Sequence, residues 1–514
     1  MIDPSLLLTF AAALFLAYLH LRRRRHSSLP LPPGPKPLPI VGNLFQMPKG
    51  HEAQVYEKWG RTYGSDILHV DLAGTSVVII NSAEIANELL ERRSSIYSSR
   101  PPFIMVTELM GFEGFLSGIP YGETWRAIRR LFHREFHPKA ALQFRPLEIE
   151  ATHDLLRRLL DFHDDFSAHF AHLAGKVIID IAYGIKVQPD NDPYVRTADL
   201  AMEALSEAGS PGAFYVESLP FLKYVPEWMP GAGFKRKARE WHMIADDMFN
   251  IPFDIAKANF MKGASVSNFT ARCLEAVQGS DESDNSRQEY LIKATAGSMY
   301  SAGSETLIST LRTFILAMLY NPEVQKRAQE EIDAVVGHGN LPDFSHQPSL
   351  PYIDAIVKEV LRWAPVTPQS VPHVVTVEDT YNGYRIPAKS IVIPNTWAML
   401  HDETVYPNPS AFLPERFLDA EGHIDPAVKD PACAAFGFGR RVCPGRYMAM
   451  SSLWITVVSV LAVFDVGKAV DEDGSCVEPS GEYTSGIVVA PLPFKASIKP
   501  RSEATKAAVL TRTG

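Results

Sequence analysis

The chain has 514 residues, of which 46% are hydrophobic and 21% charged, and its formal net charge is −9. Such a composition excludes a disordered tail, a collagen-like fibre and a polytopic membrane protein. Because residues 1–25 hold four arginines against one aspartate, the rest of the chain is more acidic still, which argues against a nucleic-acid-binding protein. The four cysteines fit neither a disulfide framework nor a C-x-x-C zinc site, so we expect a reduced, cytosol-facing protein.

The N-terminus predicts a membrane anchor. Residues 2–21 are almost entirely apolar, and the run Arg22 to Arg25 follows them. Positive charge after the apolar run favours a single-pass helix with the body in the cytosol over a cleaved signal peptide, which carries its charge before that run. Residues 29–39 hold six prolines and predict a stiff spacer, an SH3-type ligand being the less favoured interpretation. We therefore expect an anchor with a basic stop over 1–28, a proline-rich hinge over 29–43 and one globular domain over 44–514.

Turn residues and periodicity predict a mainly α domain with little sheet. Residues 67–72 and 77–80 flank one hairpin turn, and Asn382-Gly383 marks a second turn between Val374 and Ile393. Helical patterns cover 122–136, 140–160, 291–320, 322–336, 352–363 and 447–463. Because no internal repeat or second linker is evident, we expect residues 44–514 to form a single α-rich domain.

The richest segment is a glycine-rich loop around one cysteine, just before the helix expected over 447–463. It begins at Phe436 and contains Cys443. The glycines are Gly437, Gly439 and Gly445. Backbone N–H groups at a helix N-terminus lower the pKa of a thiol, and glycines let the backbone approach a flat, bulky ligand, so the arrangement suits a thiolate bound to iron. A dinucleotide-binding loop does not fit, because Val442 stands where a third glycine is needed.

This loop, F-x-x-G-x-R-x-C-x-G, resembles the haem-binding signature of the cytochrome P-450 family, the haem-thiolate monooxygenases. Further family patterns occur in the expected order over nearly the whole chain. The resemblance implies a single large α-rich haem-thiolate monooxygenase fold with small β-sheets, plus one N-terminal transmembrane helix. It implies haem b as cofactor, with Cys443 as the axial ligand of the iron. The other haem-binding residues that it implies are Arg441, Trp125, Arg129, His373, Phe436, Gly437, Gly439 and Gly445.

Two more motifs take their roles from the resemblance. Glu359 and Arg362, at i and i+3 of one predicted helix, would form a buried ionic cluster with Arg416; taken alone, an exposed helical ion pair is the commoner case. Thr306 lies just after a glycine, where a hydroxyl residue can open the helical ladder. In the family, Thr306 would hydrogen-bond the bound dioxygen and Glu305 would relay protons; an ordinary helix threonine is the alternative.

The resemblance implies insertion of one oxygen atom from O2 into a C–H bond or double bond of a small apolar organic substrate. Because no flavin or nicotinamide loop is evident, electrons are expected from a separate membrane-bound, NADPH-dependent flavoprotein reductase. Arg126, Arg130 and Arg134 form a basic stripe that would dock this reductase, unless it is only a solvated face. The chain is similar to fungal microsomal members in secondary metabolism (terpenoid, polyketide or indole tailoring), which implies the endoplasmic reticulum membrane with the catalytic domain facing the cytosol.

Family position also implies where the substrate pocket lies. It would be bordered by parts of 101–118 and 214–229, by Ser298 and Met299, and by 366–370 and 483–486. Two other functions stay open: a haem-thiolate isomerase or dehydratase that does not use O2, and a non-enzymatic membrane-tethered haem- or lipid-binding protein. The Glu305-Thr306 pair argues against both.

Overall fold

The computed structural model describes residues 29–161, 165–209, 213–264, 267–278, 282–471 and 473–511. The anchor predicted over residues 1–28 lies outside these ranges. Within them, one helix is long and apolar enough to cross a membrane, α18 (Arg446–Val463), and it is mostly buried inside the protein.

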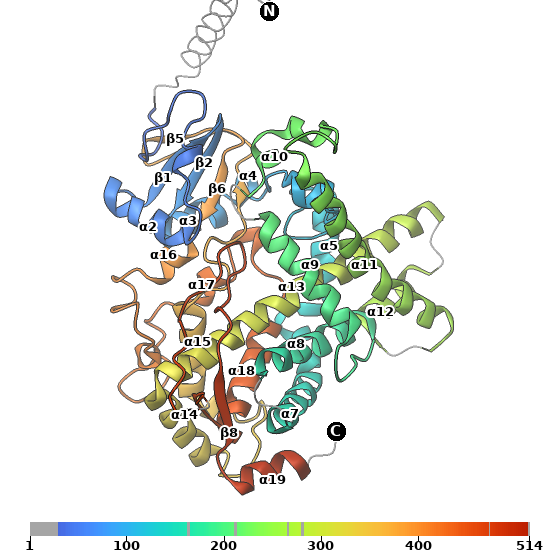
Figure 1. Cartoon of the computed structure of the whole chain (residues 1–514), viewed down its shortest axis with the longest axis vertical. Coiled ribbons are helices and arrows are strands. Elements are labelled where there is room, and N and C mark those ends of the chain that lie inside the picture. The colour runs from blue at the N-terminus through green and yellow to red at the C-terminus, as the bar shows by residue number, and fades with distance from the viewer. Residues whose placement is uncertain are drawn as a thin grey trace, which may run out of the picture.

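The body is mainly helical, as the sequence predicts (Figure 1). Its longer helices are α2 (Glu52–Tyr63), α5 (Glu123–Phe136), α7 (Arg145–Asp161), α8 (Phe166–Tyr183), α9 (Pro193–Gly209), α11 (Gly233–Met261), α12 (Phe269–Val277), α13 (Glu282–Tyr320), α14 (Pro322–Val335), α15 (Pro351–Trp363), α18 and α19 (Glu503–Thr511). Short helical segments include α3 (Ala83–Ala86), α4 (Ser94–Tyr97), α6 (Pro138–Ala141), α10 (Tyr215–Ser218), α16 (Thr396–Leu400), α17 (Ala432–Ala435), η2 (Asn87–Arg92), η3 (Ile104–Leu109), η4 (Leu142–Phe144), η5 (Pro220–Tyr224), η7 (Pro414–Phe417) and η8 (Gly439–Arg441).

Proline and glycine set several of the helix boundaries. Pro322 occupies the first turn of α14, where its missing N–H costs nothing, so α13 ends two residues earlier at Tyr320. Gly184 ends α8 with φ of +68°, a conformation that favours glycine. The helix predicted over 140–160 is wrong at its start, because α6 and η4 precede α7.

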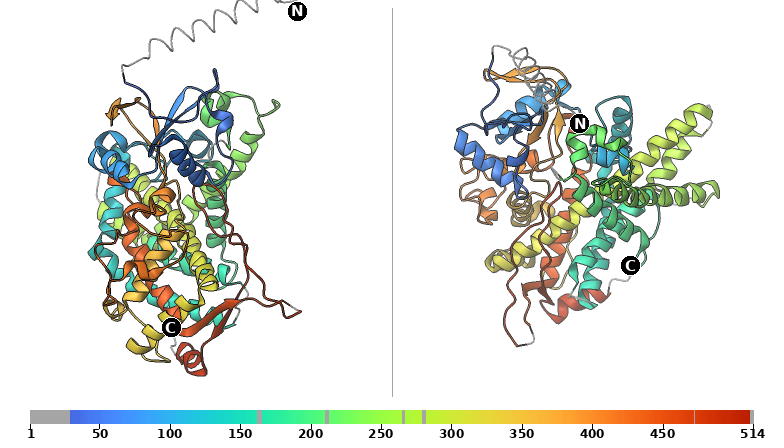
Figure 2. Two further views of the ribbon diagram at one scale, coloured as in Figure 1. Left: turned by 90° about the vertical axis from the view of Figure 1, so that its left-hand side faces the viewer. Right: turned by 45° about the horizontal axis from the view of Figure 1, so that its top comes forward.

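Strands form small sheets beside the helical body (Figure 2). They are β1 (Ile67–Leu72), β2 (Thr75–Ile80), β3 (His373–Val374), β4 (Asp379–Tyr381), β5 (Tyr384–Ile386), β6 (Ile391–Pro394), β7 (Phe464–Lys468) and β8 (Ala496–Pro500). The largest sheet has the order β1-β2-β6-β3, with β2 and β6 parallel. Both predicted hairpins are confirmed: β1 pairs with β2, and β4 pairs with β5 across Asn382 (φ +48°) and Gly383 (φ +78°).

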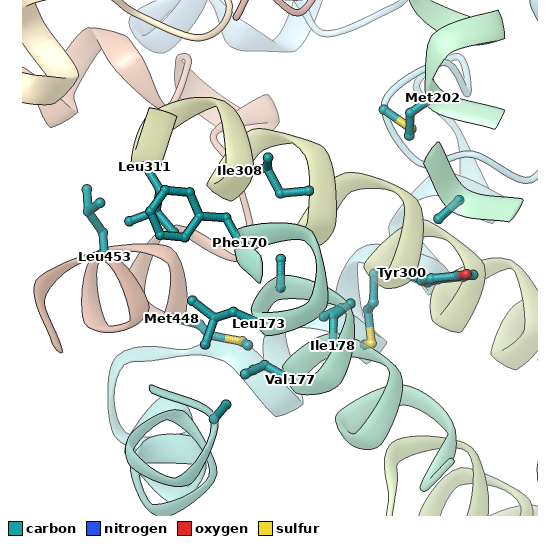
Figure 3. Close-up of a cluster of buried hydrophobic side chains, with 14 of the residues drawn as sticks. Phe170, Leu173, Val177, Ile178, Met202, Tyr300, Ile308, Leu311, Met448 and Leu453 are labelled. Atoms are coloured by element: carbon teal, nitrogen blue, oxygen red, sulfur yellow. The ribbon is translucent and has the colours of Figure 1, made fainter. Parts of the chain in front are cut away.

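The core lies where α13 crosses α8 and α18. Figure 3 shows Phe170 and Ile178 of α8, Ile308 and Leu311 of α13 and Leu453 of α18 in one cluster of buried side chains. A Cβ at Gly303 would lie 2.9 Å from Cγ1 of Ile178, so this glycine lets α8 pack closely against α13. The middle of α13 is thereby held in a fixed position beside the cavity described next.

Candidate functional site

The cysteine loop closes one side of a large cavity. Cys443 N–H donates to the carbonyl of Phe436 at 2.8 Å, and Gly437 adopts φ of +76°, which turns the loop back on itself. Gly445 then caps α18, which begins at Arg446. Cys443 therefore lies three residues before α18, a mostly buried helix, and lines the cavity.

Burial raises the pKa of the Cys443 thiol. The backbone N–H groups of Gly445 and Arg446 and the guanidinium groups of Arg129 and Arg446 act in the opposite direction. The backbone N–H groups at the start of α18 therefore lower this pKa as expected, but burial outweighs them in the protein by itself. A coordinated metal ion deprotonates a cysteine ligand outright, so the site still suits a thiolate–metal bond.

The predicted site residues mostly gather on this one cavity. Those that line it are Trp125, Arg129, Thr306, His373, Phe436, Gly437, Arg441, Cys443 and Gly445. Glu305 and Gly439 do not line it. A Cβ at Gly439 (φ +57°) would lie 2.1 Å from the carbonyl oxygen of Leu90, so this glycine serves contact with η2 rather than approach to a ligand.

Four basic residues meet at one end of the cavity, and we refer to Arg100, Arg129, His373 and Arg441 as the basic cluster. Arg441 donates from Nε to Ser98 O at 2.7 Å and from Nη2 to Ile119 O at 2.7 Å. His373 Nδ1–H donates to Tyr97 O at 2.8 Å. These backbone contacts fix the side chains without neutralising them, since no carboxylate lines the cavity in the described part of the chain.

Among the described residues that line the cavity, no carboxylate balances the charge of the basic cluster. Burial lowers the pKa of Arg441 to about 9 and also lowers the pKa of Arg129, Arg100 and His373. Each of the three arginines is a cation held away from water, which is costly unless an anion pairs with it. An anionic ligand with two carboxylates beside the cluster would satisfy these groups.

Sequence reasoning missed Arg100. It is 7% exposed and donates to three carbonyls, those of Ser117 (2.8 Å), Val371 (2.7 Å) and Pro372 (2.8 Å). The available signal was an arginine directly before two prolines and an apolar stretch, which does not by itself distinguish a buried cation from a surface one.

Thr306 of α13 also lines the cavity. Its hydroxyl donates to Ala302 O at 2.9 Å, the i−4 contact by which a hydroxyl residue can open the helical ladder, and α13 stays one helix across this turn. Glu305 does not line the cavity; it lies near enough to Arg312 to be affected by its charge, and Arg312 Nε donates to Ser167 Oγ at 2.6 Å. Burial raises the pKa of Glu305, and Arg312 opposes this rise.

The ionic cluster predicted behind the cysteine is present. Arg362 donates to Glu359 through Nε (2.7 Å) and Nη2 (2.8 Å), and both side chains are fully buried. Arg416 Nε adds a third contact at 3.2 Å, and Leu413 N–H donates to Glu359 at 2.8 Å. One carboxylate thereby ties α15 to η7 and the segment that leads to the cysteine loop.

The substrate-pocket prediction is correct in part. Lining residues come from 101–118, 298–299 and 366–370, as expected. None of residues 214–229 whose side chains are described lines the cavity, and Phe214 packs on Trp241 instead. Residues 483–486 do not line it either; Tyr483 lies within 3.4 Å of Thr313 Oγ1, and the next residues, Ile487 and Val488, form the wall.

The donor set fits haem. A cysteine sulfur stands at the cavity wall, and the basic cluster matches the two propionates of the porphyrin by charge and hydrogen-bonding type. Trp125, Phe436 and Met448 supply apolar surface for the ring. These residues would hold the group by one metal–sulfur bond, ion pairs and apolar contact.

Comparison with known proteins agrees with this donor set. The sequence model of the cytochrome P-450 family matches residues 32–498. Cytochrome P-450 monooxygenase 98 of Postia placenta is 46% identical, covering 92% of this chain and 91% of its own length. Tryptamine 4-monooxygenase of Psilocybe cyanescens is 41% identical over 97% and 98% of the two chains, and cytochrome P-450 monooxygenase ple1 of Rhodocybe pseudopiperita is 42% identical over 91% and 88%. The chain therefore belongs to the cytochrome P-450 family of haem-containing oxidoreductases.

Proposed function

We propose that the protein is a haem-thiolate monooxygenase that inserts one oxygen atom from O2 into an apolar organic substrate, by hydroxylation or epoxidation. The observation that carries this proposal is the position of Cys443 and Thr306 on one cavity whose remaining walls are largely apolar. The thiolate-bound haem would supply oxygen activation, since electron density from the sulfur favours O–O cleavage. Insertion of one atom and release of the other as water consumes two electrons and two protons.

The chain's own groups account for the protons. Burial raises the pKa of Glu305, which favours its protonated form, and Arg312 nearby would stabilise the carboxylate that remains after proton transfer. Thr306 Oγ1 lies on the cavity wall and would exchange its hydrogen bond to Ala302 O for one donated into the cavity. Leu307 and Ala302 border Thr306 on the cavity wall and limit the access of water.

Electrons would come from an NADPH-dependent flavoprotein reductase docking on the basic face of α5. Arg126, Arg130 and Arg134 are all exposed, and Arg440 of η8 extends the surface. Tyr121 lies between Arg126 and Arg440, 5.6 and 5.3 Å from their guanidinium carbons, and joins the two elements. Arg129, on the same helix between Arg126 and Arg130, lines the cavity, so α5 would connect this surface with the site.

The proposed location is the endoplasmic reticulum membrane, with residues 1–28 as a single-pass anchor and the body in the cytosol. Large apolar side chains are exposed on two segments at the end of the molecule where the described chain begins (Figure 1). They include Ile40, Phe45, Phe221, Tyr224 and Trp228. Such a surface favours contact with lipid and partitioning of apolar substrates from the membrane.

A role in fungal secondary metabolism, as terpenoid, polyketide or indole tailoring, is the proposed context. It rests on the similarity to fungal monooxygenases, one of them named for tryptamine. The test is reconstitution of the full chain with a fungal NADPH reductase in lipid vesicles under 18O2. A product that carries one 18O and requires NADPH supports the proposal; substrate conversion without label and without NADPH supports the isomerase or dehydratase instead.

The reductase face has its own test. Arg126→Glu combined with Arg130→Glu should weaken reductase-dependent turnover and its salt dependence while leaving substrate binding intact. Lys326→Glu, at an exposed lysine of α14, is the matched control. Unchanged turnover in the double variant would contradict docking on α5.

A further inference from the structure

Positive charge predominates on the cavity wall. Within the described part of the chain, the ionisable side chains that line it are the basic cluster and Cys443, and no aspartate, glutamate or lysine is among them. The basic cluster holds three guanidinium groups, whereas haem would bring two propionates. The space left for substrate is therefore next to a net excess of positive charge.

The carboxylates nearest to the distal wall are already engaged. Glu217, on α10, accepts backbone hydrogen bonds from Ile104 N (2.9 Å) and Met105 N (2.7 Å), one on each oxygen. Glu108, on η3, pairs with Lys223 at 2.7 Å. Both carboxylates join η3 to the α10–η5 segment and hold the wall that carries Val106; neither faces the cavity.

The polar groups on the substrate side are hydroxyls, and several are bonded within the protein. Ser298 Oγ accepts from Leu116 N at 3.0 Å and also contacts Gly114 O at 3.3 Å. Ser370 Oγ shares a hydrogen bond of 2.7 Å with Thr396 Oγ1. The Thr367 hydroxyl has no hydrogen bond to any described residue. Hydroxyl groups can satisfy a neutral polar group on a substrate, but they do not neutralise an ion.

We propose that the cavity disfavours substrates that carry an ammonium group and favours neutral molecules of the same shape. This inference rests on the proposed function, because it takes the space between the basic cluster and the α9 wall as the substrate site. An ammonium group would enter an apolar space without a carboxylate partner and beside excess positive charge, whereas an isosteric neutral group would gain apolar contact with Phe103, Met202 and Ile487.

The test uses ligands that differ only in charge. Three groups of similar size, tert-butyl, trimethylammonium and sulfonate, are placed on an indol-3-ylethyl skeleton and on a geranyl skeleton. The trimethylammonium nitrogen has no lone pair, so it cannot ligate the iron and confuse the result. Dissociation constants come from the displacement of water from the ferric iron, followed by absorbance, at pH 8.

On at least one skeleton, the tert-butyl ligand should bind at least tenfold more tightly than the trimethylammonium ligand, and the sulfonate ligand should also bind more tightly than the trimethylammonium ligand because the excess charge is positive. A trimethylammonium ligand that binds as tightly as either of the others would overturn the proposal. So would a haem-loaded protein that binds neither neutral ligand. A preparation without the thiolate-type band of the reduced carbonyl complex would contradict the proposed function. A preparation that shows this band and binds the ammonium ligand as tightly as the neutral one would contradict only this inference.

Two variants test the reason for the selection. Thr367→Asp places a carboxylate in the cavity at a residue whose side chain holds no protein hydrogen bond, and Thr367→Asn is its neutral isostere. The ratio of ammonium to neutral affinity should rise at least tenfold in Thr367→Asp relative to Thr367→Asn. An equal ratio in the two variants would show that the missing carboxylate does not set the preference, and would also contradict the proposal.

Discussion

The guanidinium carbon of Arg441 lies 4.5 Å from the centroid of the Trp125 ring. This contact joins the cysteine loop, two residues before Cys443, to α5. Arg129 follows Trp125 by one helical turn and faces the same cavity, so α5 supplies both an aromatic platform and a cation to the basic cluster. The same helix, α5, therefore both contacts the cysteine loop and contributes positive charge to one end of the cavity.

Arg129→Gln should weaken haem retention about tenfold. The variant removes a buried cation that would pair with a propionate, and a hydrogen bond to a charged group contributes about 1.5–3 kcal/mol. The measurement is the rate of haem transfer to a haem-scavenging protein. Arg130→Gln, at the exposed neighbour on the same helix, should retain haem like the native protein; equal rates in the two variants would contradict the role given to Arg129.

Glu359→Gln should lower the stability of the holoprotein by about 3–5 kcal/mol, because it leaves the buried guanidinium groups of Arg362 and Arg416 without their anion. Thermal unfolding monitored by circular dichroism measures the change. In the exposed pair Arg61–Glu57, Glu57→Gln should cost no more than about 1 kcal/mol. Similar melting temperatures for the two variants would show that the ionic cluster is not needed for the fold.

Thr306→Val should separate NADPH consumption from product formation. Without the hydroxyl, proton delivery into the cavity fails, so reduced oxygen is released as hydrogen peroxide and the yield of oxygenated product per NADPH falls about tenfold or more. Assays of NADPH, peroxide and product in the reconstituted system measure this. Thr295→Val, at a buried threonine of the same helix that does not line the cavity, is the control. An unchanged product yield in Thr306→Val would contradict the proton role.

Glu148 should make stability depend on pH. Its carboxylate accepts hydrogen bonds from Ser451 (2.5 Å) and Ser452 (2.7 Å) of α18, and burial raises its pKa to about 7. Because the folded state favours the protonated acid, its contribution to stability is complete below the ordinary pKa of about 4.5 and is lost as pH rises through 7.

The loss should approach ~1.4 kcal/mol per pH unit between these values. Glu148→Gln cannot titrate, so the melting temperature of the native protein should fall relative to this variant from pH 5 to pH 7. Parallel melting curves over this range would show that Glu148 does not change its protonation in the folded state.

Sequence patterns predicted local structure where a motif depends on a fixed spacing between neighbouring residues. The loop around Cys443 and the turn at Asn382-Gly383 were found because their geometry depends on near neighbours in the chain. The i and i+3 spacing of Glu359 and Arg362 indicated only a helical ion pair, and its burial with Arg416 came from the family resemblance. Helix ends at Tyr320 and Phe136 followed from the prolines that come after them.

The same local patterns could not predict contacts between residues that are far apart in the chain. Arg100 could not be placed in the cavity, because its partners Val371 and Pro372 are about 270 residues away. The wall at Ile487 was missed by one residue, since the C-terminal segment has no regular periodicity. Gly439 was assigned to ligand approach, whereas the backbone of η2 is what lies against it.

The central claim is that Cys443 is the thiolate ligand of a haem iron. The most direct measurement is the absorbance of the reduced carbonyl complex for the native protein, Cys443→Ser and Cys433→Ser, the last being an exposed cysteine of α17 ten residues earlier. We predict the thiolate-type band in the native protein and in Cys433→Ser, and its absence in Cys443→Ser. A thiolate-type band that persists in Cys443→Ser would contradict the assignment.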